Sequence, residues 1–104
     1  MLYITAVYPN DPGSRFDADY YLTSHTGCAE ALLAPHGLQA IRTTIGVAGL
    51  DGSPPPYWAV SEMHFPSREE FDAAIAASGG ALFAHIPNYT HLTPILQVSE
   101  LAAA

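Results

Sequence analysis

Basic residues are scarce in this sequence. Its 104 residues include three arginines and no lysine against ten acidic residues, which gives a formal net charge of −7. Nucleic-acid-binding proteins place lysine and arginine against phosphates, so this composition argues against such a partner. Anionic membrane surfaces are disfavoured for the same reason. We therefore expect a neutral or weakly acidic organic partner rather than a phosphate-rich one.

Cysteine and long apolar runs are scarce as well. Cys28 is the only cysteine, so no internal disulfide can form. No apolar run approaches the roughly 20 residues of a membrane-spanning helix, and the first residues lack the basic start and apolar core of a signal sequence. We therefore expect a cytoplasmic protein that neither spans nor binds a membrane.

The sequence also lacks the common spacings of cofactor and metal sites. It has no His-Glu-x-x-His, no cysteine pair, no P-loop and no dinucleotide fingerprint. Five histidines leave one alternative, a metal site assembled from residues far apart in the sequence. We expect neither a metal nor a cofactor.

Hydrophobic residues, by contrast, are abundant. They make up 49% of the chain and charged residues only 12%, although a chain of this length exposes a large share of its surface. We expect a single domain over residues 1–104, with part of its apolar surface buried against a second copy of the chain. The sequence therefore predicts a homodimer.

The order of the expected elements is strand, helix, strand, strand, helix, strand. Asp17 is a plausible N-cap of the first helix, and Ser67 with Glu70 forms a capping box for the second, which Gly79 and Gly80 end before a further helical turn over 81–86. The six elements are expected at 2–8, 17–34, 38–47, 57–65, 67–78 and 93–101.

This order is the ferredoxin-like β-α-β-β-α-β plan of the α+β class. It predicts a four-stranded antiparallel sheet with both helices on one face. The first strand, over 2–8, is apolar almost throughout and is expected to be central, with both faces buried. A second sheet packed face to face in a dimer would cover the helix-free face.

His25 is the best candidate for a catalytic residue. On a helix it shares one face with Tyr21, Cys28, Ala29 and Leu32, so it is the ionisable group on an otherwise apolar stripe. An imidazole can take or give a proton at neutral pH, which suits a general base. The alternative is a core histidine bonded to a backbone carbonyl. Cys28, in mid-helix, is expected to be buried and inert.

Four further residues are candidates for contact with a substrate. Tyr21, rather than its neighbour Tyr20, accompanies His25 by helical spacing, although packing at the rim is the competing interpretation. Asn88 and Tyr89 precede the last strand and would close one end of a pocket, or pack there structurally. His64 shares a strand face with Trp58 and Glu62, which faces either the pocket or a dimer interface.

Three segments of the chain resemble the EthD family, a member of the dimeric α+β barrel superfamily. Together they cover most of the chain in the order and spacing of that family. They are Phe16-Asp17-x-Asp19-Tyr20-Tyr21-x-x-x-His25, Met63-His64-Phe65-x-Ser67-x-Glu69-Glu70-Phe71 and Ile86-Pro87-Asn88-Tyr89-Thr90-x-x-x-Pro94-x-x-Gln97-x-Ser99-Glu100.

The resemblance implies a ferredoxin-like protomer that pairs into a barrel, and a link to bacterial ether breakdown. Relatives in the superfamily include cofactor-free monooxygenases, polyketide cyclases and muconolactone isomerases, with ligand sites between sheet and helices. The histidine of the family's first helix maps onto His25. The chain departs from the family at Thr26-Gly27-Cys28, usually a Met-Pro or similar apolar pair, and at His85, usually aspartate.

These observations lead to two main hypotheses and a third. The first is a cofactor-independent enzyme, such as a monooxygenase, cyclase or isomerase, that acts on a small apolar or aromatic compound in a catabolic or secondary-metabolite pathway. In it His25 is the general base. The second is a non-catalytic small-molecule-binding accessory protein of a degradation operon. The third, a purely structural dimer module, predicts no pocket at all.

Overall fold

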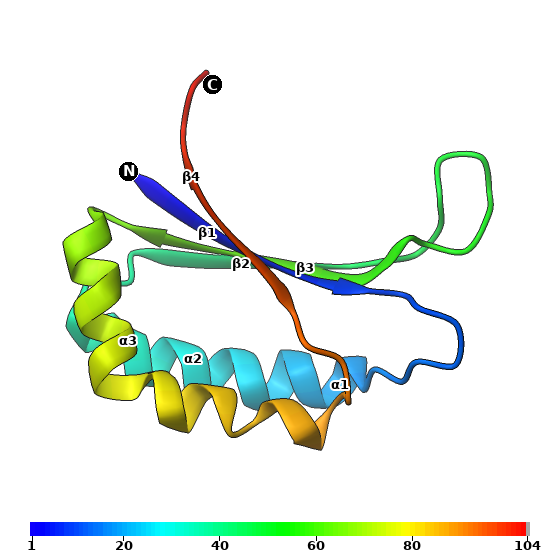
Figure 1. Ribbon diagram of the computed structural model, residues 1–104, viewed down its shortest axis with the longest axis horizontal. Coiled ribbons are helices and arrows are strands. Elements are labelled where there is room, and N and C mark those ends of the chain that lie inside the picture. Colours follow the sequence, from blue (N-terminus) through cyan, green and yellow to red (C-terminus); the bar gives the residue numbers. More distant parts are fainter. Residues whose placement is uncertain (104) are drawn as a thin grey trace.

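A four-stranded antiparallel sheet lies over a layer of helices in the computed structural model, which describes residues 1–103 (Figure 1). The strand order is β2-β3-β1-β4, and every neighbouring pair is antiparallel. This is the predicted ferredoxin-like α+β architecture, with all helices on one face of the sheet (Figure 1). The strands are β1 (Leu2–Pro9), β2 (Ala40–Ile45), β3 (Tyr57–Phe65) and β4 (Ile95–Glu100).

The first helical rod is built from four consecutive segments. Its start is fixed by the side chain of Asp17, which accepts a hydrogen bond from the backbone N–H of Tyr20 at 3.1 Å. It ends at Gly37, whose φ of +104° is a backbone conformation that glycine adopts more readily than any other residue. The four segments are α1 (Ala18–Tyr20), the π turn η1 (Tyr21–His25), α2 (Thr26–Leu33) and the 3-10 turn η2 (Ala34–His36).

The second helix, α3 (Arg68–Phe83), is longer than predicted. The expected end at Gly79 and Gly80 is wrong: both glycines are helical, and neither has a positive φ. Gly79 is buried, and a Cβ there would lie 3.0 Å from Cγ2 of Ile75, so the glycine serves close packing rather than a helix end. The expected turn over 81–86 is divided between α3 and the 3-10 turn η3 (Ile86–Asn88).

The core consists of two clusters between the sheet and the helices. The first is aliphatic apart from Phe65 and joins β1, β3, α2 and α3. The second contains Tyr8, Tyr21, Ala59 and Tyr89, with Phe16 packed against it, and is therefore mainly aromatic. A core with so many phenol hydroxyls has to pair or orient polar groups in a dry environment.

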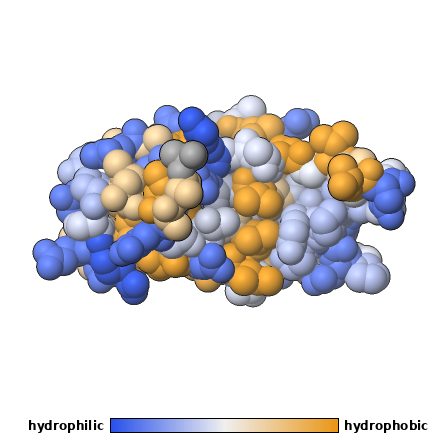
Figure 2. Space-filling view, turned by 90° about the horizontal axis from the view of Figure 1, so that it is seen from above, coloured by the Kyte–Doolittle hydropathy of each residue, from blue (hydrophilic) through white to orange (hydrophobic). Residues whose placement is uncertain are grey.

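The helix-free face of the sheet has no cover among residues 1–103. Figure 2, which looks onto this face, shows apolar residues in bands between polar ones. Tyr3, Thr5 and Val7 of β1 lie on it and are only half-buried, so the expectation that both faces of this central strand are buried is not met within one chain. On edge strand β4, Ile95 lies opposite Val7 on this face and is 59% exposed, whereas Leu96 and Val98 lie opposite Ala6 and Ile4 and face the helices.

The described residues include no helix that combines the length and the apolar character needed to cross a lipid bilayer.

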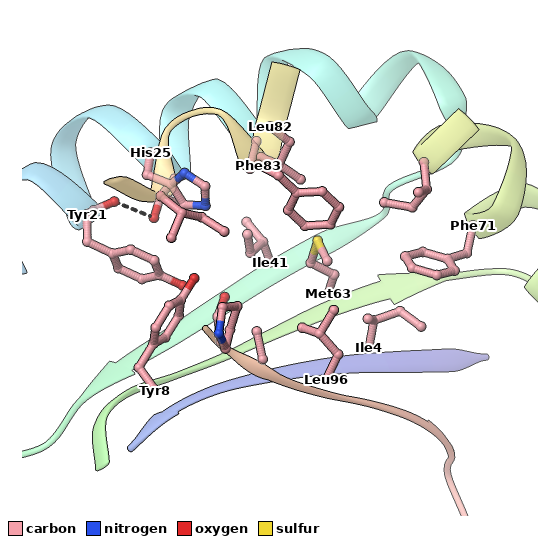
Figure 3. Close-up of a pocket in the computed structure, with 17 residues that line it drawn as sticks. Ile4, Tyr8, Tyr21, His25, Ile41, Met63, Phe71, Leu82, Phe83 and Leu96 are labelled. Carbon is pink, nitrogen blue, oxygen red and sulfur yellow. Dashed lines mark hydrogen bonds between the residues drawn. The ribbon is translucent and has the colours of Figure 1, made fainter. Parts of the chain in front are cut away.

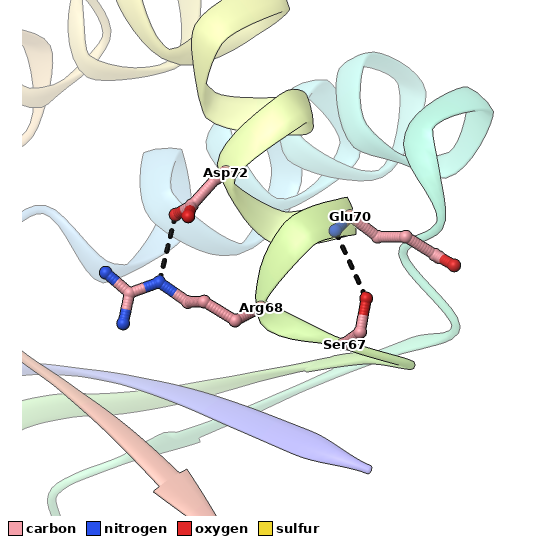
Figure 4. A network of polar contacts seen from close by, with 4 residues as sticks. All are labelled: Ser67, Arg68, Glu70 and Asp72. Atoms are coloured by element: carbon pink, nitrogen blue, oxygen red, sulfur yellow. Dashed lines mark hydrogen bonds and ion pairs between the residues drawn. The ribbon is translucent and has the colours of Figure 1, made fainter.

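Ser67→Ala is expected to lower the free energy of unfolding by about 1 kcal/mol. Ser67 Oγ accepts a hydrogen bond from the backbone N–H of Glu70 at 3.3 Å, which satisfies one free donor at the start of α3 (Figure 4). Urea denaturation measures the change. The matched control is Arg68→Ala, which breaks a solvent-exposed ion pair with Asp72 and should cost less than about 0.5 kcal/mol. Equal effects of the two substitutions would show that the cap contributes nothing.

Candidate functional site

A cavity of about 610 Å³, measured out to its open mouth, lies between the sheet and the helices (Figure 3). None of its lining residues is charged. Phe83 and Leu96 line it and are 42% and 52% exposed, which places the mouth between the end of α3 and strand β4. Apolar cavities with a few polar groups in their lining are typical binding sites of small organic molecules.

The two ends of the cavity differ in chemistry. Tyr8, Tyr21 and His25 lie together at one end, whereas Ile4 and Phe71 lie at the other (Figure 3). Thr26 and Ser61 add hydroxyl groups to the lining. Since the remaining lining residues are apolar, a molecule in this cavity would find hydrogen-bonding partners near His25 and packing surface elsewhere. The other lining residues are Ala6, Ala29, Ile41, Met63, Ile75, Leu82, Ile86, Pro94 and Leu96, with Phe83 at the mouth.

The π turn η1 places two side chains of the candidate site, Tyr21 and His25, on the same side of the rod. The backbone N–H of Thr26 bonds to the carbonyl of Tyr21, five residues earlier, and Thr26 Oγ1 donates to the same oxygen at 3.0 Å. Tyr21 and His25 are both buried, and their rings stack with centroids 5.2 Å apart. Such turns interrupt α-helices rarely and are frequent at functional sites.

His25 is a buried base without a hydrogen-bond partner on one nitrogen. It is 9% exposed, and its Nδ1 has no partner among residues 1–103. Burial and, to a smaller extent, the neighbouring His85 lower the pKa of His25 to about 4, so the ring is neutral at pH 7. A core histidine held at Nδ1 by a backbone carbonyl, the alternative interpretation, is not what the structure shows.

Three tyrosine hydroxyls meet beside this histidine. The hydroxyls of Tyr8 and Tyr89 are 2.6 Å apart, and the rings of both stand roughly edge-on to Tyr21. Burial raises the pKa of all three phenols, so they keep their protons at neutral pH and can act as donors. Tyr8 was not among the site residues predicted from the sequence. The pattern that could have indicated it is the two-residue alternation of β1, which places Leu2, Ile4, Ala6 and Tyr8 on the helix-facing side.

The structure brings some of the predicted site residues together and separates others. Tyr21 lines the cavity with His25, as spacing indicated. Tyr89 is fully buried with its ring 5.0 Å from that of His25, and it supports the wall from behind. Asn88 is exposed outside the cavity and donates to the Tyr20 hydroxyl at 2.9 Å.

His64 does not share a cavity with His25. The two-residue period of β3 turns Ser61 and Met63 toward the helices, and therefore turns Glu62 and His64 to the opposite face. There the His64 imidazole lies 2.8 Å from the Glu62 carboxylate and edge-on to Tyr3. The sequence left two positions open for Glu62 and His64, the pocket or the face expected to meet a dimer partner, and the structure places both residues on the helix-free face.

His85 is a neighbour of the site that the sequence analysis named only as a departure from the family pattern. Its ring lies 5.9 Å from that of His25, and its two nitrogens lie 3.3 Å from the Tyr20 hydroxyl and from Cys28 Sγ. Cys28 is therefore half-buried and in polar contact rather than enclosed by apolar side chains. Across residues 1–103, no group of three or more His, Cys, Asp or Glu could hold a metal ion.

Comparison with known proteins yields solved structures alone: no family model matches the chain, and neither does any curated protein. An EthD-like protein from Ralstonia eutropha is 32% identical, with a TM-score of 0.90 over 98% of this chain and 92% of its own. An EthD family protein from Bacillus halodurans is 18% identical, with a TM-score of 0.77 over 97% and 98%. An antibiotic biosynthesis monooxygenase, 12% identical, has a TM-score of 0.56 over 99% and 100%.

Proposed function

Because the chain belongs to the EthD-like family, we propose that it binds a small, mostly apolar organic compound in the His25 cavity and acts on it without a cofactor. His25 serves as the general base. The observation that carries this proposal is the neutral, buried imidazole with an unpartnered nitrogen beside a cavity lined by apolar side chains and phenol hydroxyls. Few buried polar groups lack a hydrogen-bond partner. A buried group with a shifted pKa and no partner is a candidate for a site where a ligand supplies the missing contact.

The chemistry follows from the positions of the side chains. His25 takes a proton from an acidic C–H or a phenolic O–H of the bound compound, and negative charge develops on the compound. The hydroxyls of Tyr21 and Tyr8 remain protonated and can donate to the oxygen that gains this charge. Oxygenation, cyclisation and isomerisation all begin with such a step. The likeness to a solved antibiotic biosynthesis monooxygenase agrees with this reaction group.

The proposal is tested by mapping where small ligands bind. A panel of single-ring aromatic compounds is titrated into the protein, and the NMR signals of His25 and Tyr21 are followed together with those of His36, which is exposed and distant in the fold. Saturable shifts at His25 and Tyr21, with His36 unchanged, support the proposal. Binding elsewhere, or no binding by any compound, contradicts it.

One observation favours the second hypothesis, a binding protein without turnover. A pKa of about 4 makes His25 a weak base, whereas general bases work best with a pKa near the operating pH. A ligand that donates a hydrogen bond to the unpartnered nitrogen would satisfy His25 without any proton transfer. This protein would show the same ligand map, and only turnover separates the two functions.

The proposal includes a homodimer formed through the helix-free face. Wild-type protein at micromolar concentration is expected to sediment as a dimer, because half-buried Tyr3, Thr5 and Val7 and the exposed Ile95 of β4 leave this face without cover. Thr5→Arg, in the middle of the central strand, should shift the species toward monomer. Asp51→Arg, in the exposed loop before β3, is the matched control. A wild-type monomer would contradict the proposal.

A further inference from the structure

The cavity offers no positive charge to a bound molecule at neutral pH. The chain has three arginines and no lysine, and none of the arginines lines the cavity. All three are exposed: Arg42 lies opposite Glu62 on the helix-free face, and Arg68 belongs to a surface ion pair. His25, the lining residue that could carry a positive charge, has a pKa of about 4 and is neutral at pH 7. An ionised carboxylate in this apolar site would therefore lose its hydration without gaining a cationic partner.

The polar end of the cavity presents hydrogen-bond donors and one acceptor. Tyr89 is fully buried, and its hydroxyl has one hydrogen-bond partner among residues 1–103, the Tyr8 hydroxyl at 2.6 Å. Tyr89 therefore donates to the Tyr8 oxygen, and the hydrogen of Tyr8 is left for another acceptor. The Tyr21 hydroxyl lies beside that of Tyr8, so this pair can give a hydrogen to a ligand (Figure 3). The neutral imidazole of His25 has one acceptor nitrogen in either tautomer.

The opposite end of the cavity has no polar side chain. Ile4 and Phe71 lie there, and Ile41 and Met63 lie between the two ends (Figure 3). A polar group at this end would be removed from water without a hydrogen-bond partner, which is unfavourable. A molecule with a single polar group is therefore held in one direction, with that group toward His25.

We propose that this cavity selects uncharged compounds with a hydroxyl or similar neutral group at one end and an alkyl or aryl group at the other, and that it excludes carboxylates. The neutral group lies against Tyr8, Tyr21 and His25, because it both donates and accepts hydrogen bonds. The apolar group lies against Ile4 and Phe71. This inference rests on the proposed function, since it names the class of compound that the proposed site takes.

The exclusion of charge is tested with two ligands of the same shape, para-propylbenzamide and para-propylbenzoate. Calorimetry gives their dissociation constants for the wild-type protein at pH 5, 6 and 7. A benzoic acid has a pKa near that of an acidic side chain, about 4, so about one molecule in 1000 is uncharged at pH 7. The amide should bind about 1000-fold more tightly than the benzoate at pH 7. Each unit of lower pH should strengthen benzoate binding about tenfold and leave amide binding nearly constant.

The polar group and the direction of binding are tested with para-propylphenol and propylbenzene. The phenol should bind about tenfold more tightly, the scale of one hydrogen bond. Tyr21→Phe should weaken phenol binding about threefold and leave propylbenzene binding unchanged, whereas Tyr57→Phe, at a tyrosine that is 44% exposed, is the matched control. Nuclear Overhauser effects should connect the propyl methyl group to the Phe71 ring and the ring protons beside the hydroxyl to the His25 ring.

The outcomes separate this inference from the proposed function. Equal affinities for the amide and the benzoate at pH 7 would overturn the inference, and so would a propyl methyl group that contacts His25 instead of Phe71. In both cases ligands still bind in the cavity, so the proposed function stands. If none of the four compounds binds in the cavity, the inference and the proposed function are both wrong. The two ligand comparisons use wild-type protein and decide the inference even if Tyr21→Phe does not fold.

Discussion

Replacing His25 by glutamine is expected to lower the turnover number about 10²- to 10⁴-fold, the range measured for loss of a general base. The affinity for ligand should change less than about tenfold, because most of the cavity lining that contacts an apolar ligand remains. Glutamine keeps a polar group of similar size but cannot take a proton. The measurement is steady-state turnover of a compound that the ligand map has placed at His25, together with its dissociation constant.

The same experiment separates the enzyme from the binding protein. His36→Gln, at an exposed position in η2, controls for the change in composition and should leave both constants as in the wild type. If the wild-type protein binds ligands at His25 but converts none of them, the accessory function holds. If His25→Gln keeps full turnover, His25 is not the base, and Tyr21 and Tyr8 would have to be tested in its place.

The second large expected effect is a loss of stability in mild acid. In the unfolded chain His25 has a pKa near 6.5, and in the folded protein its pKa is about 4. Between these values the unfolded chain binds a proton that the folded protein does not bind. The stability contributed by the neutral ring is therefore fully present above pH 6.5 and is lost as the pH falls toward 4. The total loss is about 3 kcal/mol, of which about 2 kcal/mol is reached by pH 5.

Urea denaturation at pH 7 and pH 5 checks this effect. The two measurements are made on the wild type and on His25→Gln, because the carboxyl groups begin to titrate in the same range and affect both proteins alike. The free energy of unfolding should fall more steeply with decreasing pH in the wild type than in the variant. Parallel pH dependence of the two proteins would show that His25 is not held neutral by the fold.

Local signals in the sequence were sufficient for most of the fold. The Asp17 and Ser67 caps lie where their side chains predicted, because capping depends on residues within a single turn. Gly79 misled because glycine marks a helix end mainly where it adopts a positive φ, and Gly79 keeps a helical φ and is buried within α3. Strand alternation grouped Glu62 with His64, but which face of β3 meets the helices depends on long-range packing.

The candidate site was only partly predictable for the same reason. Tyr21 and His25 are four residues apart on one helix, so their proximity was available from spacing alone. Tyr8, Tyr89 and His85 come from β1 and from the segment after α3, and only the fold brings them to the first rod. No residue pattern in this segment predicts a π turn. The structure defines it by the two hydrogen bonds that Thr26 donates to the Tyr21 carbonyl, from its backbone N–H and its Oγ1.

The π turn has a consequence for how this site tolerates changes in chain length. A π turn closes its hydrogen bonds over one residue more than an α-helix, which rotates by about 100° per residue, so removal of one residue from this turn changes the angle between Tyr21 and His25. Deleting Leu22 or Ser24 would therefore redirect Tyr21, although it leaves every side chain of the cavity in the sequence. Insertions and deletions in this short segment are thus as consequential for the site as substitutions of the residues that line it.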